Sequence, residues 1–540
     1  MQDIASEAGL PANTPAARDA GPALAFADAD GAKRWLKSLL LTGVTPLYEA
    51  ILGQLRALSN SDFSPRERAT IAEMLREQVV HLHTELARRY AGKSQPGADR
   101  ELDSAEQALA LWQGLWEQYS ACLKPLLEGD ADLQGVKAKL LQRGLYVGKQ
   151  LVLVNGLARR VTPGTLWQEL HAYYRLAEML DCTVAAVSDE LQPQAVGMSC
   201  YSMYCHAVLL GLADPCAMSV RQIELTDRWL GQWARKIFPY AGPRDTEGPI
   251  IMVDLDSAVG AWVAGRALAQ ATTGMRYSYP GKLATSVRGR LKRLASGSNP
   301  AELQLGHDTS VEGALALLAH LDARWYQVPR DDAAVPRAEL QISAGGVLAA
   351  YYRVGGRTFD RQDPLGRMTF QGAQHLQTLG ALTDYDRFKD EAERTWPWES
   401  WRGQYESMEA RLRRDDSTHY RWFLNQLVVA RVDAQTRLGY VSRVAFDAPS
   451  VLSISLKLWP GEPKTVALRP ISLAFAEELP VAGLILGVTR EEPSSLILPP
   501  RTFNPGRLLR SGDAGPERKF RLTRLIWRGG DFERIAFEES

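Results

Sequence analysis

Apolar residues recur at every third or fourth position from about residue 33 to residue 240, which is the period of an amphipathic α-helix. Several of these stripes follow residues that fit a helix N-cap. Ser64-Pro65-Arg66-Glu67 is a capping box with proline at the first helical position. The same spacing recurs in three further pairs: Ser104 and Gln107, Thr165 and Gln168, and Ser219 and Gln222. Helices with one apolar stripe bury it against each other, so this half of the chain predicts an all-α array.

The period changes after Gly242-Pro243. Ile250–Val253 is a short apolar run that predicts a buried strand. Leu283–Leu294 predicts a basic helix, and Val311–Leu321 predicts a second helix. Together these patterns predict a mixed α/β middle region.

Short β-rich runs separated by Gly, Pro, Asp and Asn begin at about residue 338. Many short strands at this spacing predict a barrel or a sandwich. A helical insertion at about residues 384–395 interrupts them. The predicted strands are Leu340–Ile342, Val347–Tyr352, Phe423–Val432, Leu438–Phe446, Val451–Leu458, Thr465–Leu468, Leu484–Val488 and Phe520–Ile526.

A chain of 540 residues is too long for one ordinary core, so several domains are expected. The patterns predict a multidomain α+β protein. We expect a disordered tail at residues 1–28, an α-helical domain at 29–241, a mixed α/β region at 242–335 and a β-rich barrel domain with a helical insertion at 336–540.

The 63 basic and 63 acidic side chains cancel, so no global field draws the protein to nucleic acid or to an anionic membrane. Any such contact needs a local patch. No stretch approaches the ~18 apolar residues of a membrane span, and the first residues lack the basic and apolar parts of a secretory signal. Five cysteines without a paired framework favour a reducing compartment. We therefore expect a cytoplasmic protein with no membrane partner.

The candidate metal and phosphate motifs are incomplete. Cys200 and Cys205-His206 lack the second close pair of ligands that zinc requires, and core packing explains them better. His81 and His83 are two residues apart on a predicted helix and so point to different faces. Gly281-Lys282 is followed by leucine where a P-loop has Ser or Thr. We expect no metal and no cofactor.

One motif keeps an enzymatic alternative open. The apolar run Ile250–Val253 ends in Asp254-Leu255-Asp256, which resembles the nucleophile motif of haloacid-dehalogenase-like phosphotransferases. In those enzymes the first Asp attacks phosphorus and the second acts as acid and base. The chain after Asp256 does not show the alternating β/α pattern that such a sheet needs. We therefore expect no enzyme, with a phosphotransferase using Asp254 as the minor alternative.

The C-terminal third carries a different signature. Arg357 and Arg361 form an Arg-x-x-x-Arg pair, and the turn Asp415–Tyr420 leads into the strand-rich segments QLVVARV, RLGYVSRVAF and SISLKLWPGEPKTVAL. This order resembles a PilZ barrel, the domain that binds cyclic di-GMP. The segments HAVLLGLADPCAMSVRQIE, LILPPRTFNPGRLLR and FRLTRLIWRGGDFERIAF extend the resemblance to an uncharacterised proteobacterial family with a helical N-terminal region and a C-terminal PilZ-like barrel.

The resemblance implies a ligand site. Arg357 and Arg361 would grip the phosphates of cyclic di-GMP and stack on its guanines, and Asp415 and Ser417 would hydrogen-bond the opposite side. Two features depart from the family pattern. Tyr420 stands where the motif has glycine, and more than fifty residues separate the arginine pair from the polar turn.

A basic stretch from Arg501 to Arg528 carries eight cations against Asp513 and Glu517. Few aromatic residues alternate with these arginines, and single-stranded nucleic acid needs aromatic stacking platforms. A solvated strand face explains the charges better, which argues against nucleic acid as a partner.

The sequence thus favours a cytoplasmic regulatory or adaptor protein. Its helical domain would bind a protein partner that the sequence does not name, and its PilZ-like domain would bind cyclic di-GMP. The first alternative is a protein–protein interaction module that has lost the nucleotide.

Overall fold

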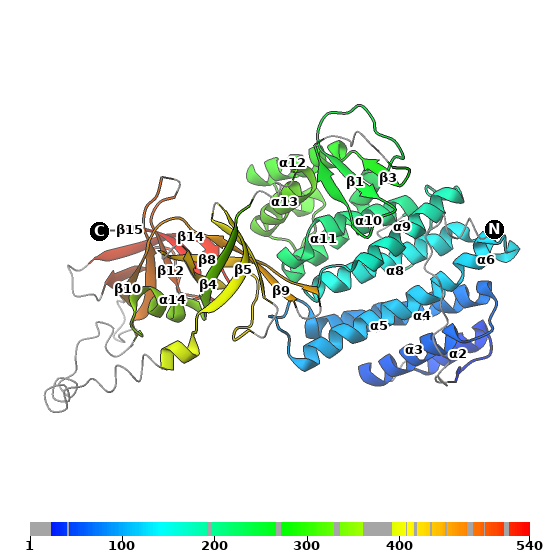
Figure 1. Ribbon diagram of the computed structural model, residues 1–540, viewed down its shortest axis with the longest axis horizontal. Helices are drawn as coiled ribbons and strands as arrows, with labels where there is room; N and C mark the ends of the chain where they lie inside the picture. The colour runs from blue at the N-terminus through cyan, green and yellow to red at the C-terminus, as the bar shows by residue number, and fades with distance from the viewer. Residues whose placement is uncertain are drawn as a thin grey trace. The chain divides into compact units, whose positions relative to one another are not determined.

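The computed structural model describes residues 23–39, 43–191, 197–265, 272–328, 335–359, 391–406, 408–414, 418–432, 435–448, 451–471, 479–490, 492–511 and 518–539. The chain divides into two compact units, called unit 1 and unit 2 below (Figure 1). Unit 1 comprises residues 1–93 and 97–330. Unit 2 comprises residues 94–96 and 331–540.

Unit 1 opens with an array of helices (Figure 1). Among the described residues, no helix is both long enough and apolar enough to cross a membrane. The helices are α2 (Ala29–Ser38), α3 (Val44–Ser59), α4 (Pro65–Tyr90), α5 (Asp99–Ala121), α6 (Leu123–Leu127), α7 (Ala131–Gln134), α8 (Lys137–Leu157), α9 (Gly164–Met179), α10 (Cys200–Leu212) and α11 (Val220–Trp233), with the short 3₁₀ helices η1 (Pro215–Ala217) and η2 (Ala234–Lys236).

Two of the four predicted N-caps are confirmed. Ser64 accepts the Glu67 N–H at the start of α4, and Ser219 accepts the Gln222 N–H at the start of α11. The other two are wrong. α5 begins at Asp99, so Ser104 lies within the helix and donates to the Arg100 carbonyl instead. α9 begins one residue before Thr165. In both cases the true N-cap has no side chain that signals it.

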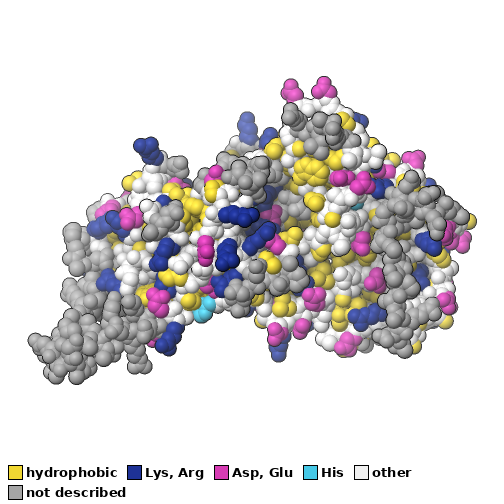
Figure 2. All heavy atoms as spheres, in the orientation of Figure 1, with side chains coloured by type: hydrophobic (Ala, Val, Ile, Leu, Met, Phe, Trp, Pro, Cys, Tyr) yellow, Lys and Arg dark blue, Asp and Glu magenta, His cyan; other side chains and the backbone are white. Residues whose placement is uncertain are grey.

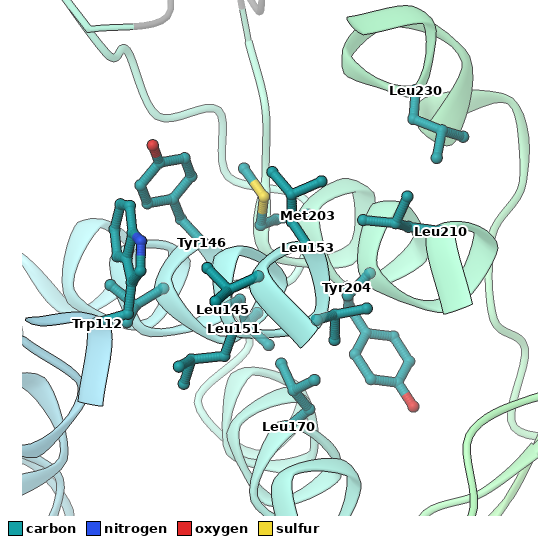
Figure 3. Packing of buried hydrophobic residues seen from close by; sticks show 14 of the residues in the cluster. Trp112, Leu145, Tyr146, Leu151, Leu153, Leu170, Met203, Tyr204, Leu210 and Leu230 are labelled. Atoms are coloured by element: carbon teal, nitrogen blue, oxygen red, sulfur yellow. The ribbon is translucent and has the colours of Figure 1, made fainter. Parts of the chain in front are cut away.

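α8 is the centre of the array, and every residue from Leu140 to Leu157 is buried. Figure 3 shows Leu145 and Leu153 of this helix among side chains of the surrounding helices. Close packing depends on glycine. A Cβ on Gly148 would lie 2.5 Å from Leu170 of α9, which no side chain tolerates without movement.

α8 also contributes buried charges. Arg143 of α8 and Arg76 of α4 share the carboxylate of Asp189, at 3.3 Å and 2.7 Å. Glu73 pairs with both arginines, each at about 3 Å. Burial alone would raise the pKa of Glu73, but the two guanidiniums overcome that effect and lower it. The loop that carries Asp189 is thereby held to two helices.

A second buried ion pair lies further along the same helix. Lys149 Nζ lies 3.0 Å from Asp227 of α11, and His206 of α10 lies 2.8 Å from the same oxygen. This carboxylate joins α8, α10 and α11 within the array. Burial would raise the pKa of Asp227, but Lys149 and His206 outweigh it and hold the pKa well below its usual range.

The middle region is part of unit 1. Strands β1 (Ile250–Asp254), β2 (Trp262–Ala264) and β3 (Met275–Ser278) form an antiparallel sheet in the order β2-β1-β3. α12 (Gly281–Ala295) and α13 (Val311–Tyr326) follow, with η3 (Ala301–Leu303) between them. The predicted strand and both predicted helices of this region are confirmed.

Unit 2 contains two closed, six-stranded antiparallel barrels. The predicted class, a multidomain α+β protein with a C-terminal barrel, is confirmed, although the sequence indicated one barrel where there are two. The first has the order β4 (Arg337–Ala344), β5 (Glu399–Glu406), β6 (Glu409–Arg414), β9 (Val451–Leu458), β8 (Gln435–Ala448) and β7 (Leu427–Val432). The second has the order β10 (Pro463–Pro470), β11 (Val481–Leu486), β12 (Ser495–Leu498), β15 (Glu533–Glu539), β14 (Lys519–Arg528) and β13 (Leu508–Ser511).

Helix α14 (Gly346–Gly355) packs between the two barrels, where the sequence predicted a strand over Val347–Tyr352. Tyr351 shares a buried cluster with Val429 of β7 and Leu484 of β11. The prediction was wrong because a continuous apolar run fits a buried strand and a buried helix equally well. Gly345 and Gly346 both have positive φ and turn the chain from β4 into the helix.

Residues 94–96, from early in the chain, pair with a residue of unit 2. Gln95 and Trp422 exchange two backbone hydrogen bonds, of 2.7 and 2.6 Å, in an isolated antiparallel bridge. Arg421 Nε donates to the Pro96 carbonyl at 3.0 Å. Residues 94–96 therefore belong to unit 2 although the chain on both sides of them belongs to unit 1.

Candidate functional site

The acidic pair at the end of β1 has structural partners. Asp254 accepts the backbone N–H of Asp256, and Asp256 is ion-paired with Arg175 of α9. A Cβ on Gly274 would lie within 3 Å of both carboxylates, so the opposite turn closes over them. The sheet is antiparallel, unlike the alternating β/α sheet that a phosphotransferase of this type requires. This geometry favours a structural role for Asp254.

The cysteine and histidine candidates lie in the helical core. Cys200 and Cys205 are buried with free thiols, as core packing predicts. His83 accepts a hydrogen bond from the Trp112 indole at 3.0 Å, and burial lowers its pKa to about 4. His206 is engaged by Asp227. Within the described residues, no group of three potential ligands is placed to hold a metal ion.

Of the residues that the PilZ resemblance assigns, Arg357 is described and Arg361, Asp415 and Ser417 lie outside the described residues. Arg357 is half-buried just beyond the end of α14. Gly356 ends that helix in the left-handed conformation, with its N–H bonded to the Tyr352 carbonyl. The Arg357 guanidinium lies 3.4 Å from the Tyr351 hydroxyl. Arg357, the first residue of the Arg-x-x-x-Arg pair, therefore directly follows a fixed helix end.

The described residues next to both halves of this predicted site converge on one segment, residues 395–399. Arg353 of α14 donates to the Trp396 carbonyl at 2.9 Å. His419 lies 3.2 Å from the Thr395 carbonyl, and the Tyr420 hydroxyl donates to the Pro397 carbonyl at 2.6 Å. Adjacent residues are about 3.8 Å apart along the chain, so the end of α14 and the turn at 418–420 approach one another here.

Glu399 holds the turn at 418–420 through hydrogen bonds to Thr418 and His419. Its buried carboxylate accepts hydrogen bonds from the Thr418 hydroxyl at 2.8 Å and from the Trp401 indole at 3.1 Å. It also accepts the His419 backbone N–H. Arg414, at the end of β6, lies 3.8 Å from the same carboxylate. The residues that flank Asp415–Ser417 are thus held at both ends by one carboxylate.

Tyr420, which replaces the glycine of the motif, is a core residue of the first barrel. It is 8% exposed and packs edge-on against Trp422. Its hydroxyl also lies 3.0 Å from that of Ser343 on β4. Burial raises its pKa. The Tyr420 ring therefore packs in the core of the first barrel, at the position where the motif has glycine.

The structure adds three residues that the sequence patterns did not single out. The guanidinium carbons of Arg353 and Arg431 lie 4.9 Å and 4.6 Å from the centre of the Trp398 ring. Arg431 is exposed, on β7, and bonds Gln341. Arginine and tryptophan together recognise planar, electron-rich rings and anions. Arg353 was missed because most of its helix, Val347–Tyr352, was predicted as a strand. Trp398 was missed because it lies in no recognisable motif.

The two units together define a multidomain α+β protein that joins a helical array to a pair of six-stranded barrels. Residues 30–238 match the family whose model is described as "Cyclic-di-GMP receptor FimW, N-terminal domain". This match spans the helical array from α2 to η2 and includes neither barrel. No curated protein and no solved structure matches the chain.

Proposed function

We propose that this protein is a cytoplasmic regulatory or adaptor protein that receives cyclic di-GMP through its barrel unit. The observation that carries the proposal is the similarity of residues 30–238 to the N-terminal domain of a cyclic di-GMP receptor. A receptor needs a place for the nucleotide and a surface for its target. In this proposal the helical array provides the surface for a protein partner and unit 2 provides the nucleotide site.

The nucleotide would lie at the 395–399 segment. Arg357 and Arg361 would contact its phosphates and guanines, and Asp415 and Ser417 would hydrogen-bond its opposite side. The convergence of Arg353 and His419 on this segment supports bringing the two groups together. A phosphodiester accepts two parallel bonds from a guanidinium, which gives both affinity and orientation.

Trp398 and Arg431 fit the guanine bases of this ligand. A purine presents a flat ring face and an acceptor edge. The exposed guanidinium of Arg431, stacked 4.6 Å from the Trp398 ring centre, offers a planar cation and donor groups in one place. Such a contact would distinguish guanine from a pyrimidine through ring area and acceptor pattern.

Isothermal titration calorimetry with cyclic di-GMP on the full chain tests the proposal. We expect saturable heat with wild-type protein. Arg357→Ala and Arg361→Ala should each weaken binding roughly ten- to a hundredfold, the loss of a charged hydrogen bond of ~1.5–3 kcal/mol. Arg524→Ala, an exposed arginine on β14, is the matched control and should bind like wild type. No heat at a ligand concentration of about 100 µM would contradict the proposal.

One observation favours a second candidate function, an interaction module that has lost the nucleotide. Tyr420 occupies the glycine position of the motif and is committed to the barrel core, so the backbone there lacks the open approach that glycine gives. Absence of a melting shift with cyclic di-GMP, together with a folded barrel, would favour this candidate.

A further inference from the structure

The exposed side of α12 in unit 1 carries a line of cations. The cations are Lys282, Arg290 and Arg293, with the neutral Ser286 among them. Spacings of three and four residues place all four on one face of the helix. From Lys282 to Arg293 this face is about 16 Å long at 1.5 Å per residue. Over the face of the molecule drawn in Figure 2, basic and acidic side chains are interspersed, whereas α12 contains no acidic residue.

Two cations meet at the middle of this line. Lys236 of η2 donates to the Ser286 hydroxyl oxygen at 2.9 Å, and Arg290 donates to the same oxygen at 2.5 Å. Both also lie over the Trp233 ring, at 6.0 Å and 5.3 Å from its centre. An ammonium and a guanidinium are therefore held within a few ångströms of each other by a neutral hydroxyl.

No carboxylate balances these charges among the residues that the structure describes: neither Lys236, Arg290 nor Arg293 takes part in an ion pair there. Two other surface arginines of unit 1 differ in this respect. Arg288, on another face of α12, pairs with Asp322 at 2.7 Å, and Arg228 pairs with Asp308 at 2.9 Å.

Electrostatics follow from this arrangement. Burial and the neighbouring charges of Arg290 and Arg235 lower the pKa of Lys236. Burial and Arg293 lower the pKa of Arg290. Neighbouring cations lower one another's pKa because they repel, and a bound anion relieves that repulsion. A multivalent oxyanion can accept hydrogen bonds from several of them at once.

The surface between the cations is open. A Cβ on Gly289 would meet no atom within 4 Å, and Gly289 lies on the same helical face as Lys282 and Arg293. Trp233 is buried, so its ring is not available to stack a base. The apolar residues of α12, among them Leu283 and Val287, face the core, so no side chain of this helix is free to insert into a bilayer.

We propose that the cluster of Lys236, Ser286, Arg290 and Arg293 binds a phosphate group, carried either by a free phosphate compound or by a lipid headgroup. The site lies in unit 1 and is independent of the proposed nucleotide site, since none of its residues belongs to unit 2.

Calorimetry and thermal unfolding of the full chain with inorganic pyrophosphate, at constant ionic strength, test the proposal. Wild-type protein should bind with a Kd below about 1 mM and melt at a higher temperature. The double variant Lys236→Gln, Arg293→Gln keeps a donor for Ser286 and should bind at least tenfold more weakly. Arg288→Gln, on another face of the same helix, should bind like wild type, and so should Arg357→Ala, which separates this site from the nucleotide site.

Flotation with phosphatidylglycerol and phosphatidylcholine vesicles distinguishes the two sources of phosphate. Flotation with phosphatidylglycerol alone, lost in the double variant and displaced by pyrophosphate, would identify a lipid headgroup. Pyrophosphate binding without flotation would identify a free phosphate compound. The proposal is overturned if wild-type protein binds neither probe, or if the double variant and Arg288→Gln weaken binding equally.

Discussion

The carboxylate of Asp531, in the turn between β14 and β15 of the second barrel, accepts the backbone N–H of Leu427, the first residue of β7 in the first barrel, at 2.8 Å. A Cβ on Gly346, at the start of α14, would lie in ordinary contact with an Asp531 carboxylate oxygen, at 3.5 Å, so this side chain also lies beside the start of the helix. One acidic side chain therefore joins the two barrels at the helix between them.

Asp531 should make the stability of unit 2 depend on pH. Burial raises its pKa to about 6, so between pH ~4 and ~6 the folded state binds more protons at this site than the unfolded state does. The free energy of unfolding should therefore fall as pH rises through this window, by roughly 2 kcal/mol. Asp531→Asn keeps an acceptor for Leu427 and cannot titrate. Urea unfolding at pH 4.5 and 7 should show a smaller pH dependence in the variant, and an unchanged dependence would contradict the assignment.

Removal of Asp189 should destabilise unit 1 strongly. Asp189→Ala leaves the buried guanidiniums of Arg76 and Arg143 without this counter-charge. Loss of one partner in such a buried network typically costs about 3–5 kcal/mol. Glu85→Ala is the control, because it breaks an ion pair with Arg88, whose side chain is 70% exposed, and should cost less than about 1 kcal/mol. Urea unfolding followed by far-UV circular dichroism measures both. Equal effects would show that Asp189 contributes no more than a surface charge.

Two glycine substitutions should have opposite signs. Gly148→Ala places a methyl group 2.5 Å from Leu170 and 2.7 Å from Trp116 in the helical core, so overpacking should cost about 1–3 kcal/mol. Gly231→Ala lies within α11, where a Cβ meets nothing within 4 Å. Alanine there should stabilise the helix by up to about 1 kcal/mol. Differential scanning calorimetry should show a lower Tm for the first variant and a higher Tm for the second.

Tyr420→Gly should not yield a better nucleotide site, although glycine is the residue of the motif. The ring is buried among Trp422 and its neighbours, and deletion of a buried aromatic side chain costs about 3–5 kcal/mol. Tyr420→Phe removes only the hydroxyl and its bonds to Ser343 and Pro397, which should cost about 1 kcal/mol. Thermal unfolding ranks the variants. A Tyr420→Gly protein as stable as wild type would show that the ring is dispensable to the core.

The fold was predictable where a local signal and the tertiary structure agree. Ser64 with Pro65 marks the start of α4, and Ile250–Val253 marks β1, because a cap or an apolar strand leaves a pattern within a few residues. The closure of two barrels instead of one leaves no such pattern, since it depends on which strands pair over long separations. β5 and β6 were missed because Glu, Arg and Gln outnumber the apolar residues in both strands, and a strand rich in such residues carries little β-propensity.

The candidate site was predictable only in outline. Arg357 and the turn at Asp415–Ser417 came from the order of motifs along the chain. The contact between Arg353 and Trp398 joins residues that are 45 positions apart in the chain. The sequence around each residue therefore does not predict this contact. The cation cluster of α12 was visible as a basic helix, but its lack of acidic partners is a property of the folded surface.

The bridge between Gln95 and Trp422 has a consequence for how the protein is made. Residues 94–96 are synthesised more than three hundred residues before Trp422, so this part of unit 2 has no partner until most of the chain has been made. No single cleavage can then yield both units whole: a fragment that starts at residue 331 lacks the partner of Trp422, and the complementary fragment displays an orphaned tripeptide. The two units are therefore better studied by mixing the two fragments than by expressing either fragment alone.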